Sequence, residues 1–239
     1  MEDLKKYKTI LIQGAMDIEI EHIIKSLKDK KFRKIKEYEF YEGTINNKKV
    51  VVSKTYIGSI DATIATTIGI IEFNPTIVIN QGIAGGHRKQ LHTGDIVIGE
   101  KCCNINSYDM PIKEQHKGSN PFEWEPNKRA KDIKYANKGL VALLEKNIKT
   151  NKKNSVYTGV LGSGDVFNRE FDRITWITEK FDNLCEDMES IGVYTVCEKF
   201  KIPCVGVRII SNNELLKEEL NEEKAIELQQ ILIDIIEEL

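Results

Sequence analysis

Two carboxylates and one arginine stand at places in this sequence where they could transfer protons and stabilise charge. Glu19 follows the short apolar run at 8–13, Glu189 stands where a helix is expected to begin, and Arg208 lies inside the apolar run CVGVRII. Paired carboxylates suit proton transfer with water and stabilisation of positive charge, and a cation among them would keep both ionised. Asn212 follows the arginine at the end of the run. If the protein acts on a small molecule, we expect these side chains to form one site.

Each of these residues also has an explanation that involves no chemistry. Alone, Glu19 is typical of a solvated acid in the first turn of a helix, and Glu189 of an acid at a helix start. A structural ion pair would explain Arg208, because a charge in an apolar strand is costly unless it has a partner or a ligand. The glycine run at 82–86 fits a tight strand-to-helix turn, since it lacks the GxGxxG order and the P-loop lysine. Only the features taken together favour a site.

Other catalytic mechanisms find no motif in the sequence. Ser163 is not part of a GxSxG motif. The four histidines show no metal-ligand spacing, and we expect His87 and His92, which flank a glycine-rich turn, at the surface. We therefore expect no metal and no cofactor. The five cysteines form no CxxC motif, and no secretory segment follows Met1, so we expect a cytoplasmic location.

The composition is that of an ordinary globular protein. The chain has 239 residues, of which 41% are apolar and 30% charged, and this fits a single α/β domain. With 35 basic and 37 acidic residues the net charge is -2, which argues against general affinity for nucleic acid. Lysine clusters at 28–36, 46–49 and 149–153 are expected in solvated loops or turns. No apolar run approaches the length of a membrane helix.

Strand-like and helix-like stretches alternate along the chain. We expect strands at 8–13, 38–45, 50–56, 76–80, 96–105, 156–161 and 204–210, and helices at 17–27, 58–74, 130–148, 169–181, 191–200 and 221–239. The second helix carries an apolar stripe, which we expect to face the core, formed by Ile60, Ile64, Ile68 and Ile71. The alternation predicts one α/β domain over residues 1–239 with a largely parallel or mixed sheet. Ligands of such sheets bind beyond the carboxyl ends of the strands, where the candidate residues lie.

The segment 106–129 interrupts this alternation. It is polar and contains three of the five prolines. A loop of this length inside a compact domain is usually functional or disordered. A lid, a subunit contact and a loose excursion all remain open for it.

Six segments, taken together and in order, resemble those of a known superfamily. They are ILIQGAMDIEIE at 10–21, PTIVINQGIAGG at 75–86, GDIVIGE at 94–100, GSGDVF at 162–167, EDMES at 186–190 and IPCVGVRIISNN at 202–213. The chain resembles the nucleoside phosphorylase and nucleosidase superfamily, and within it the 5′-methylthioadenosine/S-adenosylhomocysteine nucleosidases. This resemblance implies a central mixed β-sheet flanked by helices, and a homodimer.

The resemblance also implies roles for individual residues. Glu19 matches the acid/base that activates water, Arg208 the arginine that supports this water and the neighbouring acids, and Glu189 the ligand of a ribose hydroxyl. Splitting an N-glycosidic bond generates positive charge on the sugar, which two carboxylates suit without a metal. Further residues that the resemblance places at the substrate are Ala84, Gly85, Phe167 stacked on the purine, Asp187, Met188 against the ribose, and Ser211 beside the base.

Two positions depart from the family pattern. Ile83 replaces a small polar residue, and Asn212 replaces the aspartate that shares a proton with N7 of the leaving purine. An amide cannot donate that proton as an acid, although it can bind the N6/N7 edge of adenine. In the transition state, N7-protonated adenine presents two donors, whereas an N7-protonated 6-oxopurine presents one acceptor and one donor, which asparagine matches better. Asn213 could face the site instead of its neighbour.

The sequence predicts a purine nucleosidase that hydrolyses 5′-modified adenosines to the free base and a 5′-modified ribose. Asn212 favours one alternative, a 6-oxopurine nucleoside hydrolase similar to futalosine hydrolase, or a phosphorylase. A nucleoside-binding protein without turnover is a further alternative. Water is favoured over phosphate as nucleophile, because the turn at 14–19 carries no cation and Arg88 follows the second glycine-rich turn instead of preceding it. The expected partner is a purine nucleoside, with no nucleic acid and no membrane.

Overall fold

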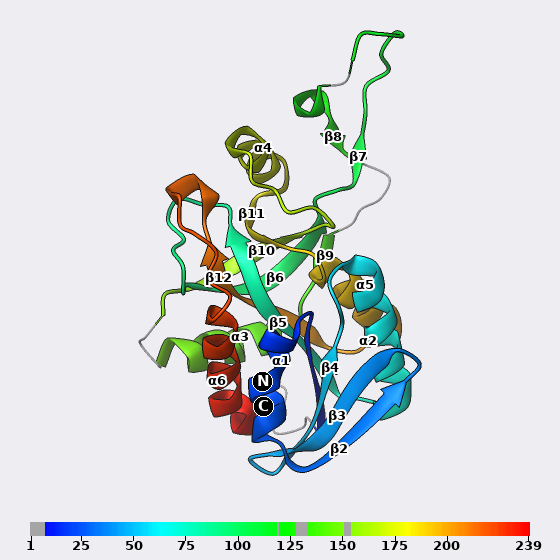
Figure 1. Cartoon of the computed structure of the whole chain (residues 1–239), viewed down its shortest axis with the longest axis vertical. Helices are drawn as coiled ribbons and strands as arrows, with labels where there is room; N and C mark the ends of the chain where they lie inside the picture. The colour runs from blue at the N-terminus through cyan, green and yellow to red at the C-terminus, as the bar shows by residue number, and fades with distance from the viewer. Residues whose placement is uncertain (1–7, 119, 128–132, 151–153) are drawn as a thin grey trace.

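The computed structural model describes residues 8–118, 120–127, 133–150 and 154–239 (Figure 1). Its strands are β1 (Thr9–Gly14), β2 (Lys28–Ile35), β3 (Tyr38–Ile45), β4 (Lys48–Lys54), β5 (Ile77–Gly86), β6 (Ile96–Asn104), β7 (Tyr108–Asp109), β8 (Glu125–Pro126), β9 (Ile133–Tyr135), β10 (Val156–Ser163), β11 (Asn183–Asp187) and β12 (Cys204–Asn212). Its α-helices are α1 (Asp17–Ser26), α2 (Ser59–Phe73), α3 (Lys138–Thr150), α4 (Phe171–Phe181), α5 (Ser190–Phe200) and α6 (Lys224–Ile235). Short 3-10 helices are η2 (Pro121–Glu123), η3 (Glu214–Leu216) and η4 (Ile236–Glu238).

Ten of the described strands form one mixed sheet in the order β11-β10-β6-β12-β5-β1-β4-β3-β2, with β9 beside β6. At its centre β1, β5 and β12 run parallel, with Ile10 opposite Ile77 and Val205 opposite Ile79. Val and Ile fill these strands because both faces of the sheet are covered. β11 pairs with β10 and also, antiparallel, with β5, so this end of the sheet closes on itself. The expected α/β fold with a mixed sheet is confirmed, and the carboxyl ends of β1, β5 and β12 meet at one edge.

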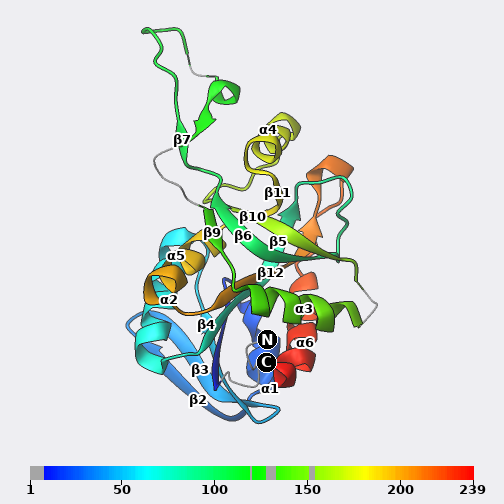
Figure 2. The ribbon, with the colours of Figure 1, turned by 180° about the vertical axis from the view of Figure 1, so that it is seen from behind.

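Helices cover both faces of the sheet. In Figures 1 and 2, α2 and α5 lie side by side along one flank, and α6 lies with α1 and α3 along the other. Gln229 ties α6 to α1, because its buried amide accepts hydrogen bonds from the backbone N–H of His22 and Ile23 and donates one to the carbonyl of Ile18. These contacts fix the first turn of α1, which follows directly on the carboxyl end of β1.

The buried face of α2 differs from the predicted one. Its core-facing residues are mostly small, and Gly69 approaches the side chains of Leu11 and Phe40. Three residues of the predicted isoleucine stripe instead face outward, with Ile60 71%, Ile64 41% and Ile71 63% exposed, while Ile68 packs against the core. Small residues allow the helix to lie close to the sheet. This close packing favours burial of the small face over burial of the isoleucine side chains. The prediction that the stripe faces the core was wrong for Ile60, Ile64 and Ile71, and the structure leaves an apolar surface on α2.

Three further boundaries differ from the sequence prediction. β5 continues through the glycine run at 82–86, which is a strand and not a turn. The lysine-rich segment 28–35 is the edge strand β2, where exposed lysines protect unpaired backbone from other chains. The helix expected to begin at residue 130 begins at Lys138, after strand β9. Of that expected helix, residues 130–132 lie outside the described part of the chain.

Residues 106–118 and 120–127 form an extension that projects from the body of the molecule, in which β7 pairs antiparallel with β8 (Figure 1). At its base Tyr108 contacts Trp124 and Trp176, with ring centroids 5.4 and 5.6 Å apart. Its outer part exposes Met110 and Ile112. The base of the segment is therefore held by aromatic contacts with α4. No helix in the described residues is long and apolar enough to cross a membrane.

Candidate active site

A pocket opens at the edge where the carboxyl ends of β1, β5, β11 and β12 meet. Nine of the ten site residues named from the sequence line it: Glu19, Ala84, Gly85, Phe167, Asp187, Met188, Glu189, Ser211 and Asn212. The tenth, Arg208, lies buried behind the wall. The structure thus brings together side chains from four strand ends that are far apart in the sequence.

Glu19 stands in the first turn of α1 and is only 3% exposed. Its Oε2 accepts hydrogen bonds from the backbone N–H of Ala15 and Met16 at 2.7 and 3.0 Å, and its Oε1 from the N–H of Ile83 at 2.9 Å. Burial raises the pKa of Glu19, while these backbone hydrogen bonds oppose the rise. A Cβ at Gly82 would collide with this carboxylate, which explains a glycine there. Glu19 is therefore a fixed, buried acid and not a solvated one.

Glu189 lies at the start of α5, on the same pocket. Its Oε1 accepts a hydrogen bond from the N–H of Gly58 at 3.1 Å, and its Oε2 one from the N–H of Met188 at 3.3 Å. Gly58 has a φ of +107°, which favours glycine, so the chain can approach the carboxylate there. Burial raises the pKa of Glu189, and the negative charge of Asp187 raises it further. Glu189 is therefore more easily protonated than a solvated glutamate.

Arg208 forms a buried ion pair with Asp187. Its Nε donates to Oδ2 of Asp187 at 3.1 Å, and neither side chain is more than 2% exposed. Its other four N–H groups donate to the carbonyls of Asn80 and Val207, to Oδ1 of Asn80 and to Oγ of Ser190. Because all five N–H groups are used in this way, Arg208 acts on the two glutamates through its charge and not through hydrogen bonds.

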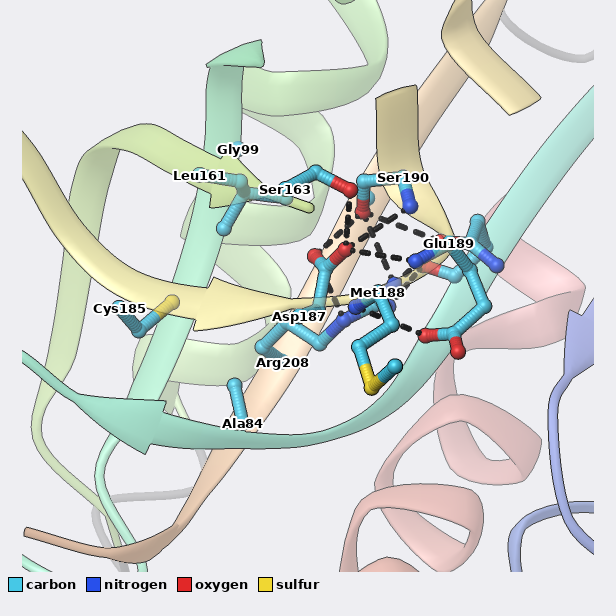
Figure 3. Close-up of polar contacts among 12 residues, drawn as sticks. Ala84, Gly99, Leu161, Ser163, Cys185, Asp187, Met188, Glu189, Ser190 and Arg208 are labelled. Carbon is cyan, nitrogen blue, oxygen red and sulfur yellow. Dashed lines mark hydrogen bonds and ion pairs between the residues drawn. The ribbon is translucent and has the colours of Figure 1, made fainter. Parts of the chain in front are cut away.

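Asp187 is the centre of this network (Figure 3). Its Oδ1 accepts hydrogen bonds from Oγ of Ser163 at 2.8 Å and from the N–H of Ser190 at 2.8 Å, and its Oδ2 one from Oγ of Ser190 at 2.6 Å. In Figure 3 the side chains of Met188 and Glu189 extend away from this carboxylate. Both carboxylate oxygens of Asp187 thus accept hydrogen bonds from other residues of the protein. This favours a positioning role for Asp187, which was predicted from the sequence to bind substrate.

Asn212, and not Asn213, reaches the pocket. The amide of Asn213 donates to the carbonyls of Arg88 and Leu91 at 2.9 and 2.7 Å, on the far side of the strand end. Asn212 accepts a hydrogen bond from Oγ of Ser211 at 2.9 Å, and its Nδ2 faces Oε1 of Glu214 at 3.5 Å. The structure thereby answers which of the two asparagines can contact a ligand.

Sequence reasoning missed one buried acidic group on the pocket wall. Glu186 is 4% exposed, lines the pocket and lies 3.3 Å from Nε2 of His87. His87 is 2% exposed, so the expectation that it lies at the surface was wrong. The only sequence signal was the position of Glu186 directly before Asp187 in a buried strand. Arg88, next to the histidine, is bound to Asp182 and does not line the pocket.

Comparison with known proteins is consistent with this arrangement. The sequence pattern of the phosphorylase superfamily matches residues 9–238. The chain therefore belongs to the phosphorylase superfamily. A 5′-methylthioadenosine/S-adenosylhomocysteine nucleosidase from Halalkalibacterium halodurans is 33% identical over 205 residues, which cover 84% of each chain. The resemblance drawn from the motifs is confirmed.

Two solved structures share the fold over nearly the whole chain. The methylthioadenosine/S-adenosylhomocysteine nucleosidase of Neisseria meningitidis, in complex with methylthio-immucillin-A, has a TM-score of 0.83 at 25% identity and covers 97% of this chain and 100% of its own. The futalosine hydrolase of Helicobacter pylori has a TM-score of 0.81 at 25% identity and covers 97% of this chain and 98% of its own. Members of this family with two different stated activities are thus about equally similar to this chain.

Proposed function

We propose that this superfamily member is a purine nucleosidase that hydrolyses the N-glycosidic bond of 5′-modified adenosines such as 5′-methylthioadenosine and S-adenosylhomocysteine. The observation that carries this proposal is the pair of buried glutamates on one pocket, each oriented by backbone N–H groups. The named activity of the relatives supports it. So does Phe167, an aromatic side chain on the pocket wall that is 49% exposed and suited to stacking on a base.

The geometry supports a division of work between the two glutamates. Glu189 binds the ribose through a hydroxyl, and Glu19 receives a proton from the attacking water. The bond between C1′ and N9 breaks with its electron pair going to the base, which takes up a proton from solvent. The water oxygen bonds to C1′, and the carboxylates stabilise the positive charge that develops on the sugar. Arg208 keeps this carboxylate-rich site from accumulating excess negative charge.

Hydrolysis is favoured over phosphorolysis. Among the described residues that line the pocket there is no lysine or arginine. Arg208 directs its N–H groups into the protein, and Arg88 is paired with Asp182. The N–H of Ile83, at the position where the family has a small polar residue, is bound to Glu19. A phosphate dianion would therefore meet carboxylates without a cation to offset them.

Product analysis tests the proposal. The pure protein is incubated with 5′-methylthioadenosine, S-adenosylhomocysteine, inosine and futalosine, with and without phosphate, and free base is separated by chromatography. We expect adenine from the first two, at a rate that phosphate does not change. If nucleoside binds but no base is released over hours, the proposal is refuted and the protein is a nucleoside-binding protein without turnover.

One observation favours a second candidate, a 6-oxopurine nucleoside hydrolase. Asn212 offers one donor and one acceptor, the pattern that an N7-protonated 6-oxopurine requires. A futalosine hydrolase is among the similar structures. Release of hypoxanthine from futalosine or inosine, with no adenine from the other substrates, would establish this candidate and contradict the first.

We further propose that the protein is a homodimer and acts in the cytoplasm. Ile60, Ile64 and Ile71 on α2 form an exposed apolar surface, and Ile57 at the pocket mouth is 56% exposed. A second copy placed on this surface would cover both. All five cysteines are free and buried, which fits a reducing compartment.

A further inference from the structure

Glu186 is a buried acid that the mechanism above does not use. Its Oε1 accepts a hydrogen bond from the N–H of Asn168 at 2.8 Å, and its Oε2 one from Nδ2 of the same residue at 2.7 Å. Nε2 of His87 lies 3.3 Å from Oε2. Nδ1 of His87 faces Nδ2 of Asn183 at 2.9 Å, so Nδ1 is the acceptor and Nε2–H points at Glu186. A backbone N–H, a side-chain amide and an imidazole N–H thus hold the Glu186 carboxylate in one orientation on the pocket wall.

Glu186 and Asn212 share one stretch of this wall. Glu186 in β11 and Asn212 in β12 both pair with Gly85 of β5, from opposite sides. A Cβ on Gly85 would lie 3.8 Å from Cγ of Glu186 and 3.7 Å from the amide nitrogen and oxygen of Asn212. Both side chains line the pocket and flank the same glycine, so a ligand bound at the asparagine amide lies next to Glu186. An aspartate at 212 would place two negative charges around this glycine, whereas the asparagine leaves one.

The surroundings of Asn212 orient its amide. Oδ1 accepts from Oγ of Ser211, and Nδ2 faces the carboxylate of Glu214, which is itself paired with Arg169 at 3.0 Å. A flipped amide would place its oxygen against that carboxylate, which is unfavourable. Oδ1 keeps a second lone pair for a ligand. The wall therefore offers two acceptors, the amide oxygen and the Glu186 carboxylate.

We infer that Glu186 is a specificity-determining residue that accepts a hydrogen bond from the exocyclic amino group of adenine while Oδ1 of Asn212 accepts one from N7–H of the departing base. Adenine protonated at N7 presents two donors on this edge, and the wall presents two acceptors. A 6-oxopurine would place its O6 acceptor against the same carboxylate. This inference rests on the proposed nucleosidase activity and assigns its base to adenine.

The test is a double-mutant cycle between positions 186 and 212, measured as kcat/KM for 5′-methylthioadenosine. Loss of a hydrogen bond to a charged group predicts that Glu186→Gln lowers kcat/KM by about 10- to 100-fold. Adding Asn212→Asp to Glu186→Gln returns a carboxylate to the same wall, and we expect it to recover at least about half of the loss on a logarithmic scale. If Glu186 only held the backbone of Asn168, the aspartate would not repair the defect. No loss in the single variant, or no recovery in the double variant, overturns the inference.

Two further measurements separate this inference from the proposed function. Glu170→Gln makes the same chemical change at an exposed position two residues from Asn168, and we expect kcat/KM within about twofold of the parent protein. Calorimetry with adenine needs no turnover, and Glu186→Gln should weaken adenine binding by about tenfold. If the parent protein releases no base, the proposed function fails while the calorimetric cycle still decides the role of Glu186. Equal adenine affinity in parent and variant overturns that role.

Discussion

Replacing Asp187 with asparagine tests whether Arg208 depends on a single buried partner. Asp187→Asn keeps the shape of the side chain but removes the negative charge 3.1 Å from the guanidinium. An amide can accept hydrogen bonds through its oxygen alone. With the NH2 group in the place of Oδ1, Oγ of Ser163 and the N–H of Ser190 would face it. With the NH2 group in the place of Oδ2, Nε of Arg208 would face it instead. Breaking one partner of a buried ion pair costs roughly 3–5 kcal/mol, and we expect the free energy of unfolding to fall by this amount.

Urea unfolding at neutral pH, followed by far-UV circular dichroism, measures this change. Asp182→Asn is the matched control, because it removes the same group from the exposed ion pair with Arg88 and should cost less than about 1 kcal/mol. Adding Arg208→Met to Asp187→Asn removes the unpaired charge and should restore part of the stability. If Asp187→Asn costs no more than the control, the buried ion pair is not what holds this wall together.

The remaining predictions concern the two glutamates and the apolar surface of α2. Glu19→Gln should lower kcat by about 100-fold or more while adenine still binds in calorimetry, and a variant with normal kcat would exclude Glu19 as the base. Burial and the charge of Asp187 raise the pKa of Glu189, so between the pKa of an unfolded glutamate and this raised value the native state binds more protons and stability falls as pH rises. Glu189→Gln should remove this loss of stability. We therefore expect the melting temperature of the variant minus that of the parent protein to increase from pH 5 to pH 8. A difference that does not change with pH would contradict the raised pKa of Glu189. Ile60→Asp with Ile71→Asp should convert a dimer to a monomer in light scattering, whereas an unchanged mass would place any interface elsewhere.

The fold and the position of the pocket could be predicted from the sequence because they depend on local patterns. Apolar runs that stop at polar residues identify buried strands, and parallel strands place their ends at one edge. The face of α2 could not be predicted in this way, since packing of Gly69 against Leu11 and Phe40 decides it and large isoleucines on the other side carry the stronger periodic signal. Only the three-dimensional arrangement brings these partners together.

The partner of each buried charge was equally hidden in the sequence. A charge inside the run at 204–210 required a partner, but nothing in the spacing distinguished Asp187 from Glu19 or Glu189 as that partner. His87 was expected at the surface because it flanks a glycine-rich turn. In the structure it is buried next to Glu186 of β11, which is more than ninety positions away in the sequence. Long-range pairs of this kind have no periodicity and follow from the sheet order alone.

The buried carboxylates at the pocket outnumber the buried cation that serves them, which favours binding of positive charge there. Glu19, Glu189 and Asp187 share one buried cation, Arg208, and Asp187 takes the only direct ion pair among them in the described residues. The two glutamates are left with backbone hydrogen bonds. Burial raises the pKa of each, and for Glu189 repulsion by the negative charges of Asp187 and Glu19 raises it further. A positively charged sugar between them would relieve this repulsion only as the glycosidic bond breaks. Since a neutral nucleoside gains little from the same carboxylates, the stabilisation applies mainly to the transition state, as catalysis requires.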